Sequence, residues 1–365
     1  MSGEKRILQL LLEAVAGGVF PGAVLLVARH KKTLFCEAVG NGAGLPAPRL
    51  MTSQTRFDLA SLTKPLATAL TVLCLVSQEK LQLDDSLAEL LPSTNIPQDK
   101  KEITLRQLLC HCSGLPAWKP YYLSLQTLPL KDRKPSLRQM ILQEPLDSSP
   151  GTVTTYSDLG FLLIEWILEQ ISGQNLHHFT RQNIFGHLGC ATPAFLPLDR
   201  GSVQDPYEFA DTEYCSWRAR TLSGQVHDEN AYVLGGVAGH AGLFGTVSEV
   251  KCVLDAILDT LSTGNTSAPW SKERLSEFLR PARLDPASTW ALGFDTPGSS
   301  DSSAGHHFSA ETVGHLGFTG TSFWLDLQRE MEVILLTNRI HPSRDNEKIK
   351  DFRPLLHDAV MEEYG

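Results

Sequence analysis

Strand-like segments lie near both ends of this 365-residue chain, and helix-like segments fill the middle. Residues 23–40, AVLLVARHKKTLFCEAVG, have the pattern of two strands joined by a turn. Near the C-terminus, TWALGFD, TVGHLGF, SFWLDLQ and EVILLTN read as short strands with tight turns. This order favours one sheet lobe built from both termini and an inserted helical lobe. The sequence predicts a fold of the α/β (α+β) class, with 1–80 and 240–365 in the sheet lobe and 81–239 in the helical lobe.

Several helices have defined starts and stops in the sequence. One is predicted from about residue 61 to 78, and a final one from about 346 to 361. SDLGFLLIEWILEQISG begins with cap-type residues and stops at Gly173, and TVSEVKCVLDAILDTLSTG stops at Gly264. In the helix predicted from about residue 61 to 78, the apolar side is formed by Leu66, Ala69, Leu70, Leu73 and Val76.

The charge balance excludes some classes of partner. The formal net charge is −9, so there is no basic excess that would hold nucleic acid. No apolar run approaches the roughly 18–20 residues that a membrane span needs. We expect neither a nucleic-acid nor a membrane partner, and the sequence leaves the oligomeric state open.

The N-terminal stretch EKRILQLLLEAVA allows two interpretations. Its charged start and the ending Ala14-Val15-Ala16 are typical of a signal peptide, but Gln9 and Glu13 interrupt a short apolar core. Ile7, Leu10, Leu11, Ala14 and Val15 instead follow the period of an amphipathic helix. This interpretation predicts a cytoplasmic protein, or a periplasmic one if a leader was trimmed from the chain.

The seven cysteines do not suggest a disulfide framework. Their number is odd and the chain is large, so we expect reduced thiols. Cys110-His111-Cys112 lacks the second cluster that a metal site would need, and neither C-x-x-C nor H-E-x-x-H occurs. His227, Asp228 and His240 are a weak metal signal, for which structural hydrogen bonding or a place in a pocket wall is the simpler interpretation. The sequence predicts no metal and no cofactor.

Ser61 and Lys64 are the first candidates for chemistry. The S-x-x-K spacing occurs four times and is not informative alone. Ser61 differs because it follows RFDLA and opens a long apolar helix, where Lys64 one turn on can place its amine near the hydroxyl. A partly desolvated lysine can lose its proton and act as a base, and a helix N-terminus helps an oxyanion. An N-cap serine beside a surface lysine is the alternative.

Two further stretches favour the chemical interpretation. Tyr156 in YSD stands just ahead of a helix, and a phenol beside a lysine can relay a proton to a leaving group. GHLGFTG lies on a predicted strand, where Gly317 would let a substrate lie close. The N–H of Phe318 can form an oxyanion hole together with that of Ser61.

In this order and spacing, the stretches resemble the serine β-lactamase and penicillin-binding protein superfamily, in its branch of class C β-lactamases, DD-peptidases and family VIII esterases. Its motifs are S-x-x-K, Y-x-N and K-T-G or H-x-G. They stand here as Ser61-Leu62-Thr63-Lys64, Tyr156-Ser157-Asp158 and His315-Leu316-Gly317. The resemblance covers about residues 20–340 and implies an antiparallel sheet flanked by helices, with a helical lobe.

Two positions depart from the family pattern. Asp158 stands where β-lactamases have Asn, and a carboxylate cannot donate to a substrate carbonyl. It would also favour charged Lys64, or it could cap the following helix. His315 replaces a lysine of fixed charge. Both changes weaken the case for efficient β-lactam hydrolysis.

The resemblance implies a serine hydrolase that acts through an acyl-enzyme on a small ester, amide or β-lactam substrate, with esterase activity expected first. In this mechanism neutral Lys64 takes the proton of Ser61. Tyr156 serves the leaving group, while His315, Gly317, Phe318 and Asp158 bind substrate or oxyanion. A DD-peptidase or weak β-lactamase is the alternative enzyme, and a non-catalytic ligand-binding protein is the alternative of another class. Possible pocket-lining residues are Trp118 and His240.

Overall fold

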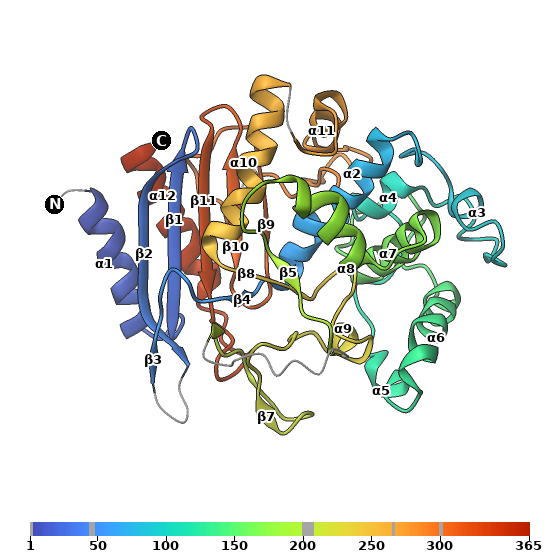
Figure 1. Cartoon of the computed structure of the whole chain (residues 1–365), viewed down its shortest axis with the longest axis horizontal. Coiled ribbons are helices and arrows are strands. Elements are labelled where there is room, and N and C mark those ends of the chain that lie inside the picture. Colours follow the sequence, from blue (N-terminus) through green and yellow to red (C-terminus); the bar gives the residue numbers. More distant parts are fainter. Residues whose placement is uncertain (1–2, 44–47, 199–207, 265–266, 299–301) are drawn as a thin grey trace.

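A six-stranded antiparallel sheet forms one side of the molecule in a computed structural model that describes residues 3–43, 48–198, 208–264, 267–298 and 302–365 (Figure 1). Its strand order is β3-β2-β1-β11-β10-β9. The bounds are β1 Gly22–Arg29, β2 Lys32–Ala43, β3 Arg49–Leu50, β9 Thr312–Leu316, β10 Ser322–Asp326 and β11 Met331–Thr337. β1 pairs with β11, with Val24 opposite Leu336, so the two ends of the chain meet in the middle of the sheet. The predicted α/β fold with an antiparallel sheet is confirmed.

Strand β1 is apolar on both faces because helices cover both. Ala23, Leu25 and Val27 belong to a core shared with α1 (Gly3–Ala16) and α12 (Ile349–Tyr364). The alternating residues Val24 and Leu26 belong to the larger core, which also includes α10 (Val247–Thr263). The strand period of two therefore turns the run AVLLVAR into the central layer of a three-layer structure.

Helix α1 is amphipathic and packs on the sheet. Ile7, Leu11 and Ala14 are its buried residues, one helical turn apart. The amphipathic interpretation of the N-terminal stretch is confirmed. The prediction of a strand over TWALGFD is wrong. Residues 289–295 form no strand, and Asp295 alone makes an isolated bridge, to Gly314.

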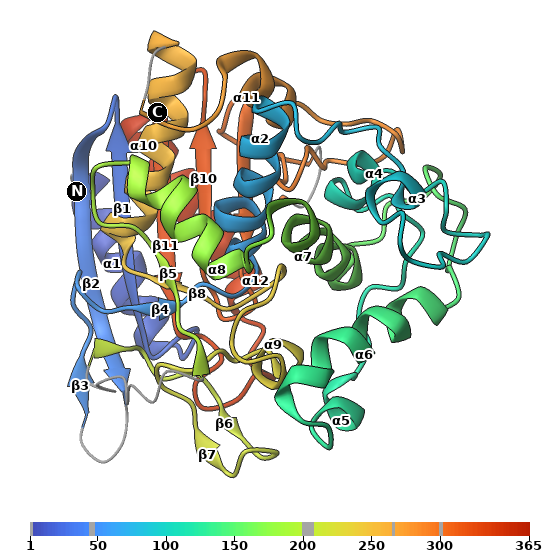
Figure 2. The same cartoon turned by 45° about the vertical axis from the view of Figure 1, so that its right-hand side comes forward.

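Helices fill the space beside the sheet, and α3, α5 and α6 lie farthest from it in both views (Figures 1 and 2). The α-helices of this part are α2 Leu70–Ser77, α3 Leu87–Leu90, α4 Leu105–Leu109, α5 Tyr122–Leu125, α6 Leu130–Gln143, α7 Asp158–Ser172, α8 Leu176–Phe179, α9 Glu229–Val233 and α11 Lys272–Phe278. Shorter 3-10 and π segments are Ala60–Leu62, Lys64–Ala69, Thr180–Ile184 and Phe185–His187.

Two small sheets lie outside the large sheet. β4 (Phe57–Asp58), β8 (Leu243–Gly245) and β5 (Ala194–Phe195) form one of them, and β6 (Tyr214–Cys215) and β7 (Arg220–Thr221) form the other. β5, which lies within the range 81–239, thus pairs with β8, the strand that leads directly into α10. The lobe boundaries at 80 and 240 stay a prediction.

The segment Ala60–Ser77 is long and apolar enough to cross a membrane by length and composition, so the statement that no run approaches that length is wrong. However, 89% of the segment is buried inside the fold. It forms the central helical run of the larger core and carries the buried Lys64. These observations identify it as a core helix.

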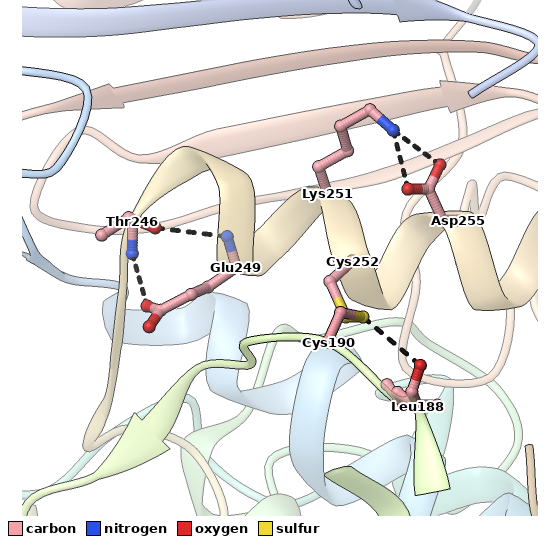
Figure 3. Close-up of a disulfide and its surroundings, with 7 residues drawn as sticks. All are labelled: Leu188, Cys190, Thr246, Glu249, Lys251, Cys252 and Asp255. Atoms are coloured by element: carbon pink, nitrogen blue, oxygen red, sulfur yellow. Dashed lines mark hydrogen bonds and ion pairs between the residues drawn. A yellow bond between two sulfur atoms is a disulfide. The ribbon is translucent and has the colours of Figure 1, made fainter. Parts of the chain in front are cut away.

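Cys190 and Cys252 are joined by a disulfide, which ties the segment before β5 to α10 (Figure 3). The expectation of reduced thiols is wrong for this pair, because the fold brings together two cysteines that are 62 residues apart in sequence. Cys36, Cys74, Cys110, Cys112 and Cys215 are free. The cytoplasmic location stays a prediction.

Candidate active site

Ser61 and Lys64 lie side by side at the start of the central helical run. Lys64 Nζ is 3.1 Å from Ser61 Oγ. Ala60, directly before the serine, has φ +48°, a left-handed conformation that is uncommon for alanine. Asp58 holds this turn, since its Oδ1 accepts the Ala60 N–H at 2.9 Å and its Oδ2 accepts the His227 N–H at 2.6 Å. The strained turn presents the Ser61 hydroxyl to solvent beside the amine.

Lys64 is fully buried and forms an ion pair with Asp158, with Nζ 2.6 Å from Oδ1. Burial lowers the pKa of Lys64, but the charges and hydrogen bonds of Asp158 and Tyr156 outweigh burial and raise the pKa above its usual value. Lys64 is therefore an ammonium at rest, and the expectation of a neutral lysine does not describe the resting protein. Asp158 does not cap α7, because the N-cap is Ser157, whose Oγ accepts the Gly160 N–H.

Tyr156 completes the group around Ser61. Its hydroxyl interacts with both Ser61 and Lys64, and Lys64 Nζ lies 4.7 Å from the centre of its ring. Partial shielding of the hydroxyl from water raises the pKa of the phenol, and Asp158 adds to this effect, although Lys64 opposes it, while 36% of the residue stays exposed. Tyr156 is thus a protonated phenol that can donate to a leaving group.

His111 fixes the backbone on both sides of Tyr156. The Thr155 N–H donates to the His111 carbonyl at 2.9 Å, and the Ser157 N–H donates to Nδ1 at 3.0 Å. Burial, Lys64 and His315 hold the pKa of His111 well below its usual value, so the imidazole is neutral. Sequence analysis missed this role, because only the Cys-His-Cys pattern drew attention to His111.

The turn between β9 and β10 packs directly against the segment before Ser61. Thr321 Oγ1 donates to the Leu59 carbonyl at 3.1 Å. A Cβ on Gly317 would lie 2.8 Å from that same carbonyl and 2.0 Å from Thr321 Oγ1. Gly317 therefore allows two protein segments to meet, and it also lines the cavity, so the predicted approach of a substrate to it stays a prediction. Phe318 follows it and lines the same cavity as Ser61.

His315 carries no charge for a substrate. Its Nδ1 lies 2.8 Å from the Leu316 carbonyl, which assigns the proton to Nδ1. Burial and the nearby Lys64 lower its pKa to about 3. The partial charge expected at this position is absent at neutral pH, and the buried Nε2 has no hydrogen-bond partner in the described part of the chain.

The buried His240 and the half-buried Asp228 form a second pair near Lys64, with Nε2 2.9 Å from Oδ1. Asp228 is the N-cap of α9, where it accepts the Ala231 N–H. Asp158, Asp228 and His240 bring carboxylate and imidazole atoms within 4.8 Å of one another, but Asp158 is paired with Lys64 and Asp228 with His240. The absence of a metal stays a prediction.

One cavity of about 600 Å³ opens at this site, and Ser61, Tyr156, Asp158, His240 and His315 line it, whereas Lys64 lies buried behind Ser61. Trp118 and His240, the two expected pocket residues, are among its walls. Sequence analysis missed Trp290, whose ring centre lies 5.4 Å from that of Tyr156, and the basic residues Arg339 and Arg353. Among the described residues, both guanidinium groups donate to main-chain carbonyls and neither forms an ion pair with a carboxylate.

The sequence model of the Beta-lactamase family matches residues 8–357. The "N-acetylmuramyl-L-alanine amidase" of Bacillus subtilis strain 168 is 32% identical over 92% of this chain and 81% of that protein. The "Putative D-alanyl-D-alanine carboxypeptidase" of Escherichia coli strain K12 is 31% identical over 90% of this chain and 81% of that protein.

Solved structures share the fold at low identity. "EstCE1, a hydrolase with promiscuous acyltransferase activity" superimposes with a TM-score of 0.73 at 21% identity, covering 98% of each chain. The octameric penicillin-binding protein homologue from Pyrococcus abyssi has a TM-score of 0.72 at 18% identity, covering 96% of this chain and 77% of that one.

Proposed function

The chain belongs to the beta-lactamase family of serine hydrolases, and from that premise we propose that it cleaves ester or amide bonds of small acyl substrates through a covalent intermediate on Ser61. The observation that carries the proposal is the contact of 3.1 Å between the buried Lys64 Nζ and the Oγ of Ser61, which lines the cavity. A hydroxyl within hydrogen-bond reach of an amine is the arrangement that activates a serine nucleophile.

The proposed reaction has two steps. After Lys64 has lost its proton, it takes the proton of Ser61 while Oγ attacks the acyl carbon, and the N–H groups of Ser61 and Phe318 hold the oxyanion. Tyr156 protonates the departing alcohol or amine, which leaves an acyl ester on Ser61. Water then attacks the acyl carbon as deprotonated Tyr156 takes its proton, and the bond from that carbon to Ser61 Oγ breaks. The carboxylic acid leaves, and the Lys64 ammonium returns its proton to Ser61.

The substrate bond is an ester or an amide, with β-lactams disfavoured. The Asp158 carboxylate cannot donate a hydrogen bond to the acyl-amide group of a penicillin, and His315 is neutral. The names of the B. subtilis and E. coli relatives support amide substrates alongside esters.

A DD-carboxypeptidase is the second candidate, and one observation favours it. Arg339 and Arg353 line the cavity without a carboxylate partner in the described part of the chain, which suits a substrate with a free carboxylate. A non-catalytic binding protein is disfavoured, because such a protein would not need Ser61 and Tyr156 on a cavity wall with the amine of Lys64 directly behind them.

The test is a substrate panel of short p-nitrophenyl esters, nitrocefin and peptides ending in D-Ala-D-Ala, with Ser61→Ala as the control. We expect ester or peptide turnover in the wild type, a loss of at least about a thousandfold in Ser61→Ala, and an unchanged circular dichroism spectrum. Trapping of an acyl group on Ser61 by intact mass would identify the intermediate. Undiminished turnover in Ser61→Ala would rule out the proposal.

A further inference from the structure

The backbone of His240 is fixed beside Lys64 by hydrogen bonds from two helical segments. It is 1% exposed, and its main-chain oxygen lies 3.4 Å from Lys64 Nζ. The preceding Gly239 donates its N–H to Glu165 Oε2 at 2.9 Å and accepts from Thr68 Oγ1 at 2.6 Å. The imidazole is therefore fixed next to the lysine by α7 and by the central helical run.

The space around Gly239 leaves the His240 loop no freedom to move toward α7. A Cβ on Gly239 would lie 2.2 Å from the Phe161 carbonyl. Gly242, with φ +115°, ends the same loop, where a Cβ would lie 2.4 Å from the Gly236 carbonyl. The distances between His240 and its charged neighbours are therefore set by the fold.

The charged groups facing His240 and Lys64 come from several elements. His240 faces Asp228 at the start of α9, Asp158 at the start of α7, and Lys64, while Glu165 contacts the loop from α7. The remaining titratable groups that face Lys64 are Tyr156, His111 and His315, and the last two are neutral.

Burial alone lowers the pKa of His240, but Asp228 and Asp158 outweigh it and raise the pKa above its usual value. The site thus pairs two basic side chains, Lys64 and His240, with two carboxylates, Asp158 and Asp228. Without the cation on His240, both carboxylates would act on the single ammonium of Lys64.

Resting on the function proposed above, we propose that His240 is a positioning residue that neutralises Asp228, so that Lys64 faces one uncompensated carboxylate and can release its proton to become the base for Ser61. His240 touches neither substrate nor the reacting atoms in this role. It acts through the field at Lys64, and Asp228 acts through His240.

The test follows the pH dependence of Ser61 labelling by a fluorophosphonate probe, measured by intact mass in the full-length chain. The midpoint is the pH at which the labelling rate is half its maximum. In His240→Gln the unpaired Asp228 adds negative charge near Lys64, so we expect this midpoint to rise by about one pH unit. In His240→Gln/Asp228→Asn that charge is gone, so the midpoint returns to within about 0.3 unit of the wild type. Asn keeps the N-cap of α9.

The matched control is His306→Gln, which breaks another His–Asp pair, that of His306 with Asp358 at 2.8 Å, whose residues are not part of the cavity wall. Its labelling midpoint should equal that of the wild type. A lower rate without a shift in His240→Gln, or a larger shift in the double variant, indicates a structural role and overturns the inference. A neutral His240 at pH 7 by imidazole NMR also overturns it, whereas absence of any wild-type labelling at Ser61 counts against the proposed function itself.

Discussion

The ammonium of Lys64 and the carboxylate of Asp158 form an ion pair of 2.6 Å beside the hydroxyl of Ser61. The pair couples the base to a group that a typical family member lacks, since asparagine occupies this place in the Y-x-N motif. Because a carboxylate stabilises the charged form of a neighbouring amine, the pair delays the release of the proton from Lys64 as the pH rises.

The first prediction concerns the pH profile of Asp158→Asn. The pKa of Lys64 is raised in the wild type, so the free base forms only at high pH and kcat/KM should rise with pH through the alkaline range. Removing the carboxylate lowers that pKa, so the rise of kcat/KM should occur at a pH about one to three units lower. The measurement is kcat/KM for a p-nitrophenyl ester from pH 6 to 10. A rise that stays at the same pH would mean that Asp158 does not hold the proton on Lys64.

The sequence was sufficient for the parts of this site that depend on local pattern. Ser61 and Lys64 are one helical turn apart, and strand patterns at both ends of the chain predicted one sheet built from both termini. The pairing of β1 with β11 in the middle of that sheet came only from the structure. It could not show partners that only the fold brings near. His111, which fixes Tyr156, is 45 residues away from it, and its role depends on a neutral imidazole that accepts from the Ser157 N–H.

Gly317 shows how a position found in the sequence can have a second reason that only the fold reveals. The pattern GHLGFTG predicted a glycine that makes room for substrate, and Gly317 lines the cavity, but the space a Cβ would need is also taken by Thr321 and the Leu59 carbonyl. The sequence could not show this contact because Leu59 lies more than 250 residues away along the chain. The disulfide between Cys190 and Cys252 escaped prediction for the same reason, since nothing in their local surroundings marks them as neighbours.

The second prediction follows from this contact. In Gly317→Ala the new methyl group must displace Thr321 or the segment before Ser61, which costs about 1–3 kcal/mol of stability and moves Phe318 away from Ser61. We expect kcat/KM to fall by about a hundredfold, as for the loss of one oxyanion donor, while KM changes little. Steady-state kinetics and thermal unfolding measure both effects.

The control is Gly42→Ala, whose Cβ would meet its nearest neighbour, Met51 Sδ, at an ordinary 3.7 Å. It should keep the wild-type kcat. Full activity in Gly317→Ala would show that the turn does not set the geometry at Ser61.

The third prediction concerns the disulfide between Cys190 and Cys252. It closes a loop with a sequence separation of 62 residues, for which the chain-entropy relation gives about 4 kcal/mol of stabilisation as an upper estimate. Cys190→Ser and Cys252→Ser should each lower the melting temperature by several degrees, and a dithiol reductant should lower it in the wild type but not in the variants. Cys36→Ser, at a free and exposed cysteine, is the control. Seven reactive thiols in the denatured, unreduced protein would contradict the bond.

The last prediction concerns Glu332, the second residue of β11. Its side chain is 0% exposed, and burial, together with the charge of Asp255, raises its pKa to about 9, although Lys251, 3.8 Å away, opposes the shift. The folded state therefore binds a proton that the unfolded state releases above pH 4.5, its usual pKa. The corresponding stability is complete below that pH and is lost as the pH rises toward 9, by at most about 1.4 kcal/mol per pH unit.

Glu332→Gln mimics the protonated carboxyl and removes this loss. We expect the variant and the wild type to unfold at similar temperatures at pH 5, and the variant to unfold about 5 °C higher at pH 8. Glu330→Gln changes a carboxylate in the neighbouring turn, where Glu330 pairs with His30 at the surface, so its melting curve should follow that of the wild type at both pH values. If the difference in unfolding temperature between Glu332→Gln and the wild type stays constant from pH 5 to 8, Glu332 is ionised in the sheet. Lys251, rather than a bound proton, then balances its charge.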